Sequence, residues 1–191
     1  WVLAGNNIYT GVTTIIEGTL QIGGGGATGT LGSAVVINSG TLVFNRSDSV
    51  SVANVINDSA TETQAGSVTQ AGSGMTTLTG NSSYSGVTSV TGGTLSVATL
   101  ASGGVSSNIG SSSSAASNLV LNGGTLRYTG AGVNTDRLFS VGTSGGALDA
   151  SGTGALRFVN PGAMEFNSQT GARSLTLTGA NTGANTIAAV I

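Results

Sequence analysis

Three charged residues near the C-terminus follow one another at intervals of eight residues: Asp149, Arg157 and Glu165. Eight residues make about one short strand and one turn, so these side chains could share one face of adjacent strands. Glycoside hydrolysis needs two carboxyl groups within roughly 5–10 Å of each other. Because polysaccharide lyases and glycosidases carry such carboxylates and arginines on one face, the pattern raises the alternative of a carbohydrate-active enzyme.

A surface role explains the same charges more simply. Arg157 and Glu165 each lie between two apolar residues spaced two apart. In an extended chain this spacing turns the charged side chain away from the apolar pair. The chain has only seven acidic residues among 191, and they are not clustered. We therefore expect charges that solvate the surface, no catalytic residues, and a protein that is not an enzyme.

Other motifs for chemistry are weak or missing. Residues 24–29 fit the dinucleotide pattern GxGxxG, but the residues that follow are too few and too β-branched for the helix this motif needs, which predicts a loop. The chain has no His, Lys or Cys, which excludes a P-loop lysine, a Ser-His-Asp triad, a zinc site and a disulfide. No calcium site or cofactor is expected, because the aspartates are isolated from one another in the sequence: Asp48, Asp58, Asp136 and Asp149.

The remaining composition limits the partners. The five cations are single arginines, so the basic patch of a nucleic-acid binder is missing. No apolar run is long enough for a membrane-spanning helix. Asp136 and Arg137 are expected to form a turn with a surface ion pair. Tyr9, Tyr84 and Tyr128 could stack on cell-surface or extracellular-matrix glycans. However, Tyr9 and Tyr84 share one place in a repeat, which favours a structural role.

That repeat organises the whole chain. Leu78–Val97 (LTGNSSYSGVTSVTGGTLSV) repeats Leu3–Ile22 (LAGNNIYTGVTTIIEGTLQI) at an offset of 75 residues, with ten of twenty positions identical. A shorter third copy begins at Leu177 as LTGANTGANTI. Such self-similarity is typical of arrays whose units bury their apolar faces by stacking on neighbours. Residues 1–191 are therefore expected to form a single solenoid segment.

Pairs of apolar residues spaced two apart predict which side chains form the core. The pairs are Leu20/Ile22, Leu42/Phe44, Leu95/Val97, Leu126/Tyr128, Leu156/Phe158, Met164/Phe166 and Leu175/Leu177. The residue inside each pair is polar in six of the seven, so these positions are expected to face solvent. Leu148, Leu156 and Met164 follow at eight-residue spacing, and three such steps would close a coil of roughly two dozen residues.

A second set of copies indicates where insertions lie. Residues 34–44 (AVVINSGTLVF) match residues 118–128 (NLVLNGGTLRY) at an offset of 84. Because the two offsets differ, the units tolerate insertions, which are expected to project as loops from one face of the stack. The serine-rich tract 102–117 is the likeliest insertion, and the glycine-rich residues 23–32 are expected to form a loop.

The motifs GNNIYTGVTTIIEGTLQIG and GNSSYSGVTSVTGGTLSV resemble the autotransporter-associated β-strand repeat, also called the passenger-associated transport repeat, of large bacterial surface proteins. The resemblance implies an all-β, right-handed parallel β-helix, here of roughly eight or nine coils. It also implies an extracellular or cell-surface passenger with a structural or adhesive function, as a stalk, a display scaffold or a self-associating fibre element.

Both ends of the sequence are apolar. The chain begins Trp1-Val2-Leu3 and finishes Ile187-Ala188-Ala189-Val190-Ile191, and none of these side chains is charged. Natural arrays usually carry polar caps on their terminal coils. The segment is therefore expected to be part of a longer array, and its partners are expected to be neighbouring coils or copies of itself joined end to end.

Overall fold

The protein is all-β. The computed structural model describes residues 1–191 as nineteen strands and one 3-10 turn (Ala116–Asn118), with no α-helix. Every pair of hydrogen-bonded strands is parallel. The predicted parallel β-solenoid is therefore confirmed.

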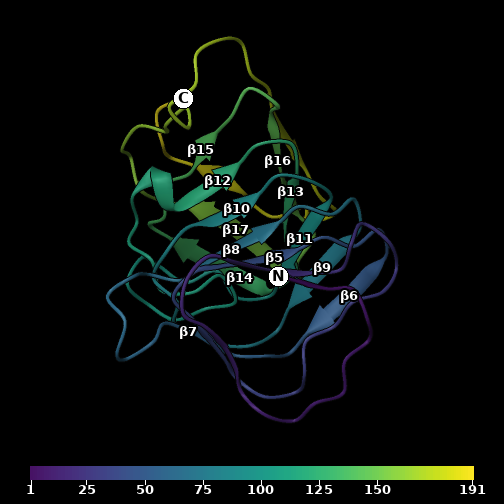
Figure 1. Cartoon of the computed structure of the whole chain (residues 1–191). Helices are drawn as coiled ribbons and strands as arrows, with labels where there is room; N and C mark the ends of the chain where they lie inside the picture. Colours follow the sequence, from purple (N-terminus) through teal and green to yellow (C-terminus); the bar gives the residue numbers. More distant parts are fainter.

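The strands form three sides of a coil. The first side is a seven-stranded sheet of β1 (Val2–Leu3), β3 (Thr19–Ile22), β5 (Thr41–Phe44), β8 (Ser67–Gln70), β10 (Thr88–Val90), β12 (Leu119–Leu121) and β15 (Ser140–Val141). The second is a six-stranded sheet of β6 (Ser49–Val52), β9 (Met75–Leu78), β11 (Thr94–Val97), β13 (Thr125–Tyr128), β16 (Gly146–Ala150) and β18 (Leu175–Thr178). Figure 1 shows β5, β8, β10, β12 and β15 one above another, with β6, β9, β11, β13 and β16 beside them.

The third side is split into two sheets. One holds β2 (Thr13–Ile15), β4 (Val36–Asn38) and β7 (Ile56–Asn57), and the other holds β14 (Ala131–Thr135), β17 (Gly154–Phe158) and β19 (Thr186–Ile187). Residues 82–84 and 107–111 lie between them. Tyr84 N donates to Ile56 O (3.2 Å), and Ser111 N donates to Tyr84 O (2.8 Å). Ser82 and Ser107 form an antiparallel bridge. Irregular backbone thus continues the stack where the sheet is interrupted.

The stack has about seven turns, so the expected eight or nine coils were too many. Met75 pairs with Thr94, nineteen residues later, whereas Thr88 pairs with Leu119, thirty-one residues later. The expectation assumed coils of about two dozen residues throughout. Longer connections on the third side and near the C-terminus use up residues without adding turns.

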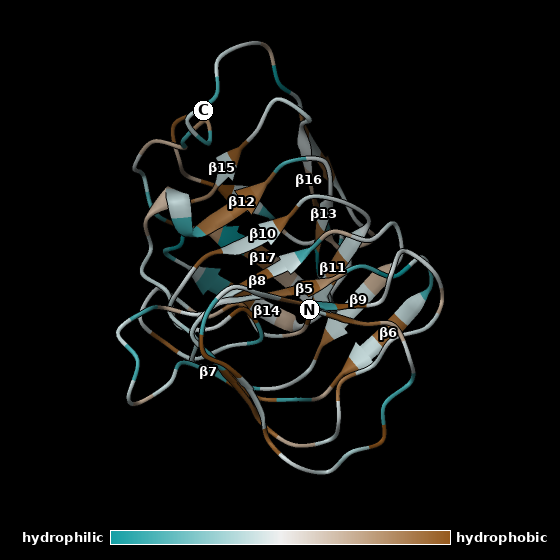
Figure 2. Ribbon diagram, viewed as in Figure 1, coloured by the Kyte–Doolittle hydropathy of each residue, from teal (hydrophilic) through white to brown (hydrophobic).

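The predicted alternation is confirmed through the middle of the stack. Leu95, Leu126 and Leu156 are buried. Leu148 on β16, Leu156 on β17 and Met164 in the segment after β17 are also buried, and they face the core from the three sides of one turn. All three residues of β12 are apolar, so that strand is brown along its length in Figure 2. Two expectations were wrong. Ser96 is buried although it lies inside a pair, and Phe166 and Leu177 are exposed in the last turn.

Candidate functional site

The structure does not assemble the three charged residues that suggested an enzyme. Asp149 lies on β16 in the six-stranded sheet, Arg157 lies on β17 in the third side, and Glu165 pairs with Ser140 at the edge of the seven-stranded sheet. The common face that the enzyme alternative requires is not formed, because each step of eight residues carries the chain around a corner to the next side. The two carboxylates are therefore not presented side by side.

Asp149 and Arg157 have structural contacts of their own. Asp149 Oδ2 lies 3.5 Å from Nε of Arg127, its ladder partner on β13, and Asp149 also accepts a hydrogen bond from Ser151 Oγ. Arg157 Nε donates to Ala184 O (3.1 Å). The contacts of Asp149 with Arg127 and of Arg157 with Ala184 join neighbouring turns.

The glycine-rich loop 23–32 encloses an arginine. Arg46 Nη1 donates to Gly29 O (2.6 Å) and Nη2 donates to Ala27 O (2.7 Å), while Arg46 also pairs with Asp48 at 2.8 Å. The hydrogen bond from Arg46 lowers the pKa of Asp48. No helix follows the loop, so the prediction that these residues form a loop is confirmed.

The serine-rich tract 102–117 does not project from the stack as expected. Ser107, Asn108 and Ile109 are buried within it. Asn108 Oδ1 accepts from the backbone N–H groups of Ala98 (2.9 Å) and Thr99 (2.8 Å). The tract packs into the third side because its polar atoms form hydrogen bonds there. Its low content of apolar residues does not predict this packing.

Arg137 holds this tract from the following turn. Its side chain is buried, and it donates to Ala101 O (2.8 Å), Ser112 Oγ (2.8 Å) and Gly110 O (3.0 Å). Burial lowers the pKa of this guanidinium. The expectation of a surface ion pair with Asp136 was wrong. Asp136 Oδ1 instead accepts from Gly103 N (2.7 Å). The sequence shows only an arginine in a polar stretch, so nothing in it marks Arg137 as buried.

The tyrosines have structural roles, as expected. Tyr9 Oη lies 2.7 Å from Thr13 Oγ1, and Tyr84 Oη lies 2.8 Å from Thr88 Oγ1, so both repeat copies make the same contact. Tyr84 is fully buried, and this burial raises its pKa. Tyr128 is also buried, and its Oη accepts from Gly132 N (3.1 Å). The three tyrosines therefore do not form a row that could stack on a glycan.

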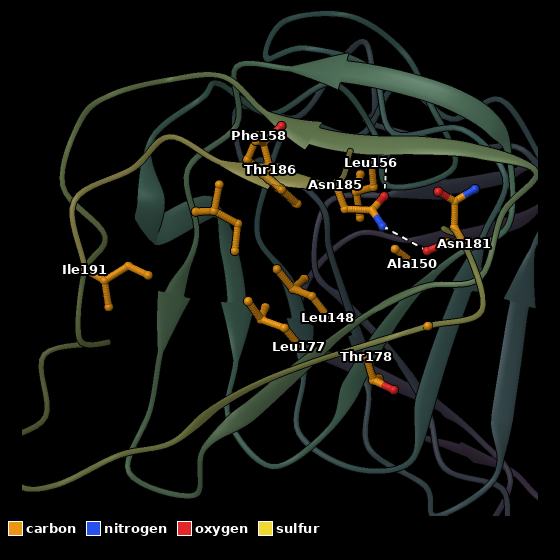
Figure 3. Close-up of a pocket in the computed structure, with 12 residues that line it drawn as sticks. Leu148, Ala150, Leu156, Phe158, Leu177, Thr178, Asn181, Asn185, Thr186 and Ile191 are labelled. Atoms are coloured by element: carbon orange, nitrogen blue, oxygen red, sulfur yellow. Dashed lines mark hydrogen bonds between the residues drawn. The ribbon is translucent and has the colours of Figure 1, made fainter. Parts of the chain in front are cut away.

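Two apolar hollows lie at the ends of the stack. The larger, which we call the C-terminal pocket, has a volume of about 540 Å³ and is lined by residues such as Leu148, Leu156, Phe158, Leu177 and Ile187 (Figure 3). The two asparagine side chains in it, Asn181 and Asn185, bind backbone. Asn185 Oδ1 accepts from Leu156 N (2.9 Å), and Asn185 Nδ2 donates to Asn181 O (3.3 Å). The pocket is the open end of the core.

The chain contains no cluster of three or more side chains suited to hold a metal ion. It also has no helix with the length and apolar character needed to cross a membrane.

Comparison with known proteins identifies the repeat. Residues 1–22, 68–97 and 168–189 match the family described as Passenger-associated-transport-repeat, and these ranges contain the three copies found in the sequence. The chain is 49% identical over 98 residues to the Adhesin BmaC autotransporter of Brucella suis biovar 1 (strain 1330). The alignment covers 51% of this chain and 3% of that adhesin. No solved structure matches the chain significantly. The predicted resemblance is confirmed: the chain is a β-solenoid that carries three passenger-associated transport repeats and is similar to part of an autotransporter adhesin.

Proposed function

We propose that this segment is a rigid length of stalk, displaying other parts of an adhesive protein outside a bacterial cell. The observation that carries the proposal is the continuous stack: parallel ladders run along two sides, and two shorter parallel sheets joined by hydrogen-bonded irregular backbone form the third, around one core of 28 buried residues. Each inner turn is bonded to the turn above and the turn below. A stack of this kind resists bending because bending would separate backbone hydrogen bonds on one side.

The distribution of charge supports a scaffold rather than an enzyme. The candidate carboxylates point from different sides, and the two ion pairs, Arg46–Asp48 and Arg127–Asp149, lie far apart in the stack. The similarity to an autotransporter adhesin supports a location at the cell surface or outside the cell. Neighbouring coils are the partners we propose, and glycans of a host surface or matrix are a further partner class for the adhesive protein.

The length of the stalk follows from strand spacing. Neighbouring strands lie about 4.8 Å apart, so seven turns extend about 34 Å. A flexible linker of the same number of residues would instead give a broad range of distances around roughly 75 Å. Mean distance and width of distribution therefore both distinguish a stalk from a linker.

Surface display tests the proposal. The chain would be placed between an outer-membrane anchor and a fluorescent tag on bacteria, and the height of the tag would be measured by axially resolved fluorescence. We expect a narrow increase of about 34 Å over the anchor alone. A Leu126→Asp variant, which places a carboxylate in the core, should give the broad linker distribution. A broad distribution for the wild type would contradict the stalk, and a glycan array with the same protein would test direct glycan binding.

A further inference from the structure

One corner of the coil contains the dipeptide Asn122-Gly123, the only Asn-Gly sequence in the chain. The corner joins β12 to β13, and both strands have hydrogen-bonded neighbours on each side. Asparagine is a thermally labile residue. It is most labile before glycine, because without a Cβ the glycine nitrogen can approach the preceding side chain. The residue types at this corner therefore indicate a site of spontaneous chemical modification.

The turns on both sides hold the corner in place. Asn122 N donates to Val90 O in the preceding turn (2.9 Å), and Gly123 N donates to Gly145 O in the following turn (2.7 Å). Asn122 Oδ1 accepts a hydrogen bond from Ser144 N, also in the following turn (3.1 Å). The backbone nitrogen of the glycine and the side-chain carbonyl of the asparagine are thus both bonded to the following turn.

Deamidation at this corner would exchange ammonia for water in two steps. The backbone nitrogen of Gly123 attacks Cγ of Asn122, the Cγ–Nδ2 bond breaks, and ammonia leaves with the proton of the glycine nitrogen. Water then opens the resulting succinimide ring at either carbonyl carbon, which gives an aspartate or an isoaspartate. Water is the only other reactant in this sequence of steps.

The fold opposes the first step. The reaction requires Gly123 to give up its N–H proton and its nitrogen to turn towards Asn122, but that N–H group is bonded to Gly145 O. The corner must therefore separate from the following turn before the ring can form. Where such an opening is fast relative to the chemistry, the rate of reaction follows the population of the open state.

The second set of repeat copies supplies an internal comparison. Asn38 corresponds to Asn122 in that repeat, and it is followed by Ser39 in place of a glycine. Asn38 is fully buried, and its Nδ2 donates to Ser67 O (2.9 Å). Asn122 is only partly buried, and its Nδ2, the leaving group, donates no hydrogen bond within the chain. The two equivalent asparagines are therefore expected to differ in reactivity.

We infer that Asn122 is a spontaneous deamidation site that the following turn protects, so that the folded stack preserves this residue and an opened chain converts it. An isoaspartate at this position adds one atom to the backbone at the corner and displaces Gly123 N from Gly145 O. Opening of the following turn thereby becomes irreversible. The inference does not rest on the stalk proposal, because it concerns the lifetime of the folded stack and not what the stack displays.

Peptide mass spectrometry of the whole chain tests the inference. The protein would be kept at mildly alkaline pH, folded or in urea, and each asparagine followed by the mass change of replacing its NH2 group with a hydroxyl. Asn122 should react more than about tenfold faster in urea, equivalent to an opening free energy above about 1.4 kcal/mol. Asn38 should react slowly in both solutions. Gly123→Ser, measured in urea, should slow the reaction at Asn122 to the rate of Asn38.

Two core substitutions distinguish local opening from unfolding of the whole chain. Leu148→Ala removes a buried side chain from β16, which begins directly after Gly145, and should raise the rate at Asn122 in the folded protein. Leu42→Ala on β5 is the matched control, because it also leaves a core cavity but lies three strands away from β12. It should leave the rate at the wild-type value. Far-ultraviolet circular dichroism would verify that both variants are folded.

The modified protein provides a readout that does not depend on the rate. Wild-type chains converted in urea and returned to buffer should unfold at a lower urea concentration than unconverted chains, because the corner can no longer bond to the following turn. Chains of Gly123→Ser given the same treatment retain Asn122, so their urea midpoint should be the same before and after it.

Three results would overturn the inference. Equal rates at Asn122 in folded and urea-unfolded wild type would show that the corner is not protected. Equal increases in Leu148→Ala and Leu42→Ala would show that only unfolding of the whole chain exposes the site, so that the following turn has no particular role. A converted chain with an unchanged urea midpoint would show that the modification leaves the junction between turns intact.

Discussion

Tyr9 and Tyr84 occupy the same position in two copies of one repeat, so their substitution by alanine compares a terminal turn with an inner one. Both hydroxyl groups contact a threonine four residues later. Both rings also pack against a glycine of the following turn, Gly32 and Gly110. The pair differs in burial, since Tyr84 is fully buried and Tyr9 is 37% exposed. The difference in stability between the variants therefore reports on the additional neighbouring turn.

The expected magnitudes follow from buried area. An aromatic side chain buries at least about 150 Å² in a core, and at about 25 cal/mol per Å² its removal costs about 4 kcal/mol. We expect this loss in the free energy of unfolding for Tyr84→Ala. Because Tyr9 retains 37% of its exposure, the same calculation gives about 2.5 kcal/mol for Tyr9→Ala.

Urea unfolding followed by far-ultraviolet circular dichroism would measure both values. Trp1 fluorescence is unsuitable as the probe because that side chain is 96% exposed in the folded protein. The slope of unfolding free energy against urea should stay constant, so that midpoints report stability. Equal losses for the two variants, or a larger loss for Tyr9→Ala, would refute the view that stacked turns account for the burial of this repeat position.

Five other substitutions test the core, the close contacts between turns and the pH dependence. Leu126→Ala should cost about 2–5 kcal/mol and Arg127→Ala under about 1, by the same urea assay, whereas equal costs would mean that the faces of β13 are misassigned. Gly154→Ala should cost about 1–3 kcal/mol because its new Cβ would meet Ala131 O, while Gly11→Ala, with open space around it, should change stability by less than about 1. Burial raises the pKa of Tyr84 above the unfolded value of about 10, so the folded state keeps a proton that the unfolded state loses. Stability should therefore be complete below about pH 10 and fall above it by up to about 1.4 kcal/mol per pH unit, and Tyr84→Phe should lessen that fall in melts at rising pH.

The sequence by itself determined the fold class and most of the core. Apolar residues spaced two apart, such as Leu126 and Tyr128, have to share one face of a strand, and both are buried. The repeated units predicted stacking, because a short strand pair cannot bury its apolar face alone. The absence of His, Lys and Cys excluded several classes of site, because those sites require the side chains that this chain lacks.

Only the tertiary structure decided which side of the coil each unit occupies. The ladder that starts at Leu20 reaches Thr88 on β10 three turns later. The repeat equivalent of Leu20, however, is Leu95, which lies on the next strand, β11. The strands of the first copy, β2 and β3, therefore lie in the third side and in the seven-stranded sheet. The equivalent strands of the second copy, β10 and β11, lie in the seven-stranded and the six-stranded sheet. Turn lengths between nineteen and thirty-one residues cause this shift, since the repeat has no fixed relation to one full turn.

The same cause explains why the alternative of an enzyme site on one face is not supported. Spacing along the chain does not specify how far each step turns around the axis. Asp149, Arg157 and Glu165, which the enzyme alternative placed on one face, therefore lie on three sides. The burial of Arg137 depends on contacts with Ala101 and with the serine-rich tract, 25 to 36 residues away in sequence. Local pattern fixes which face of a strand is apolar, but the partners of polar groups depend on which segments the coil brings together.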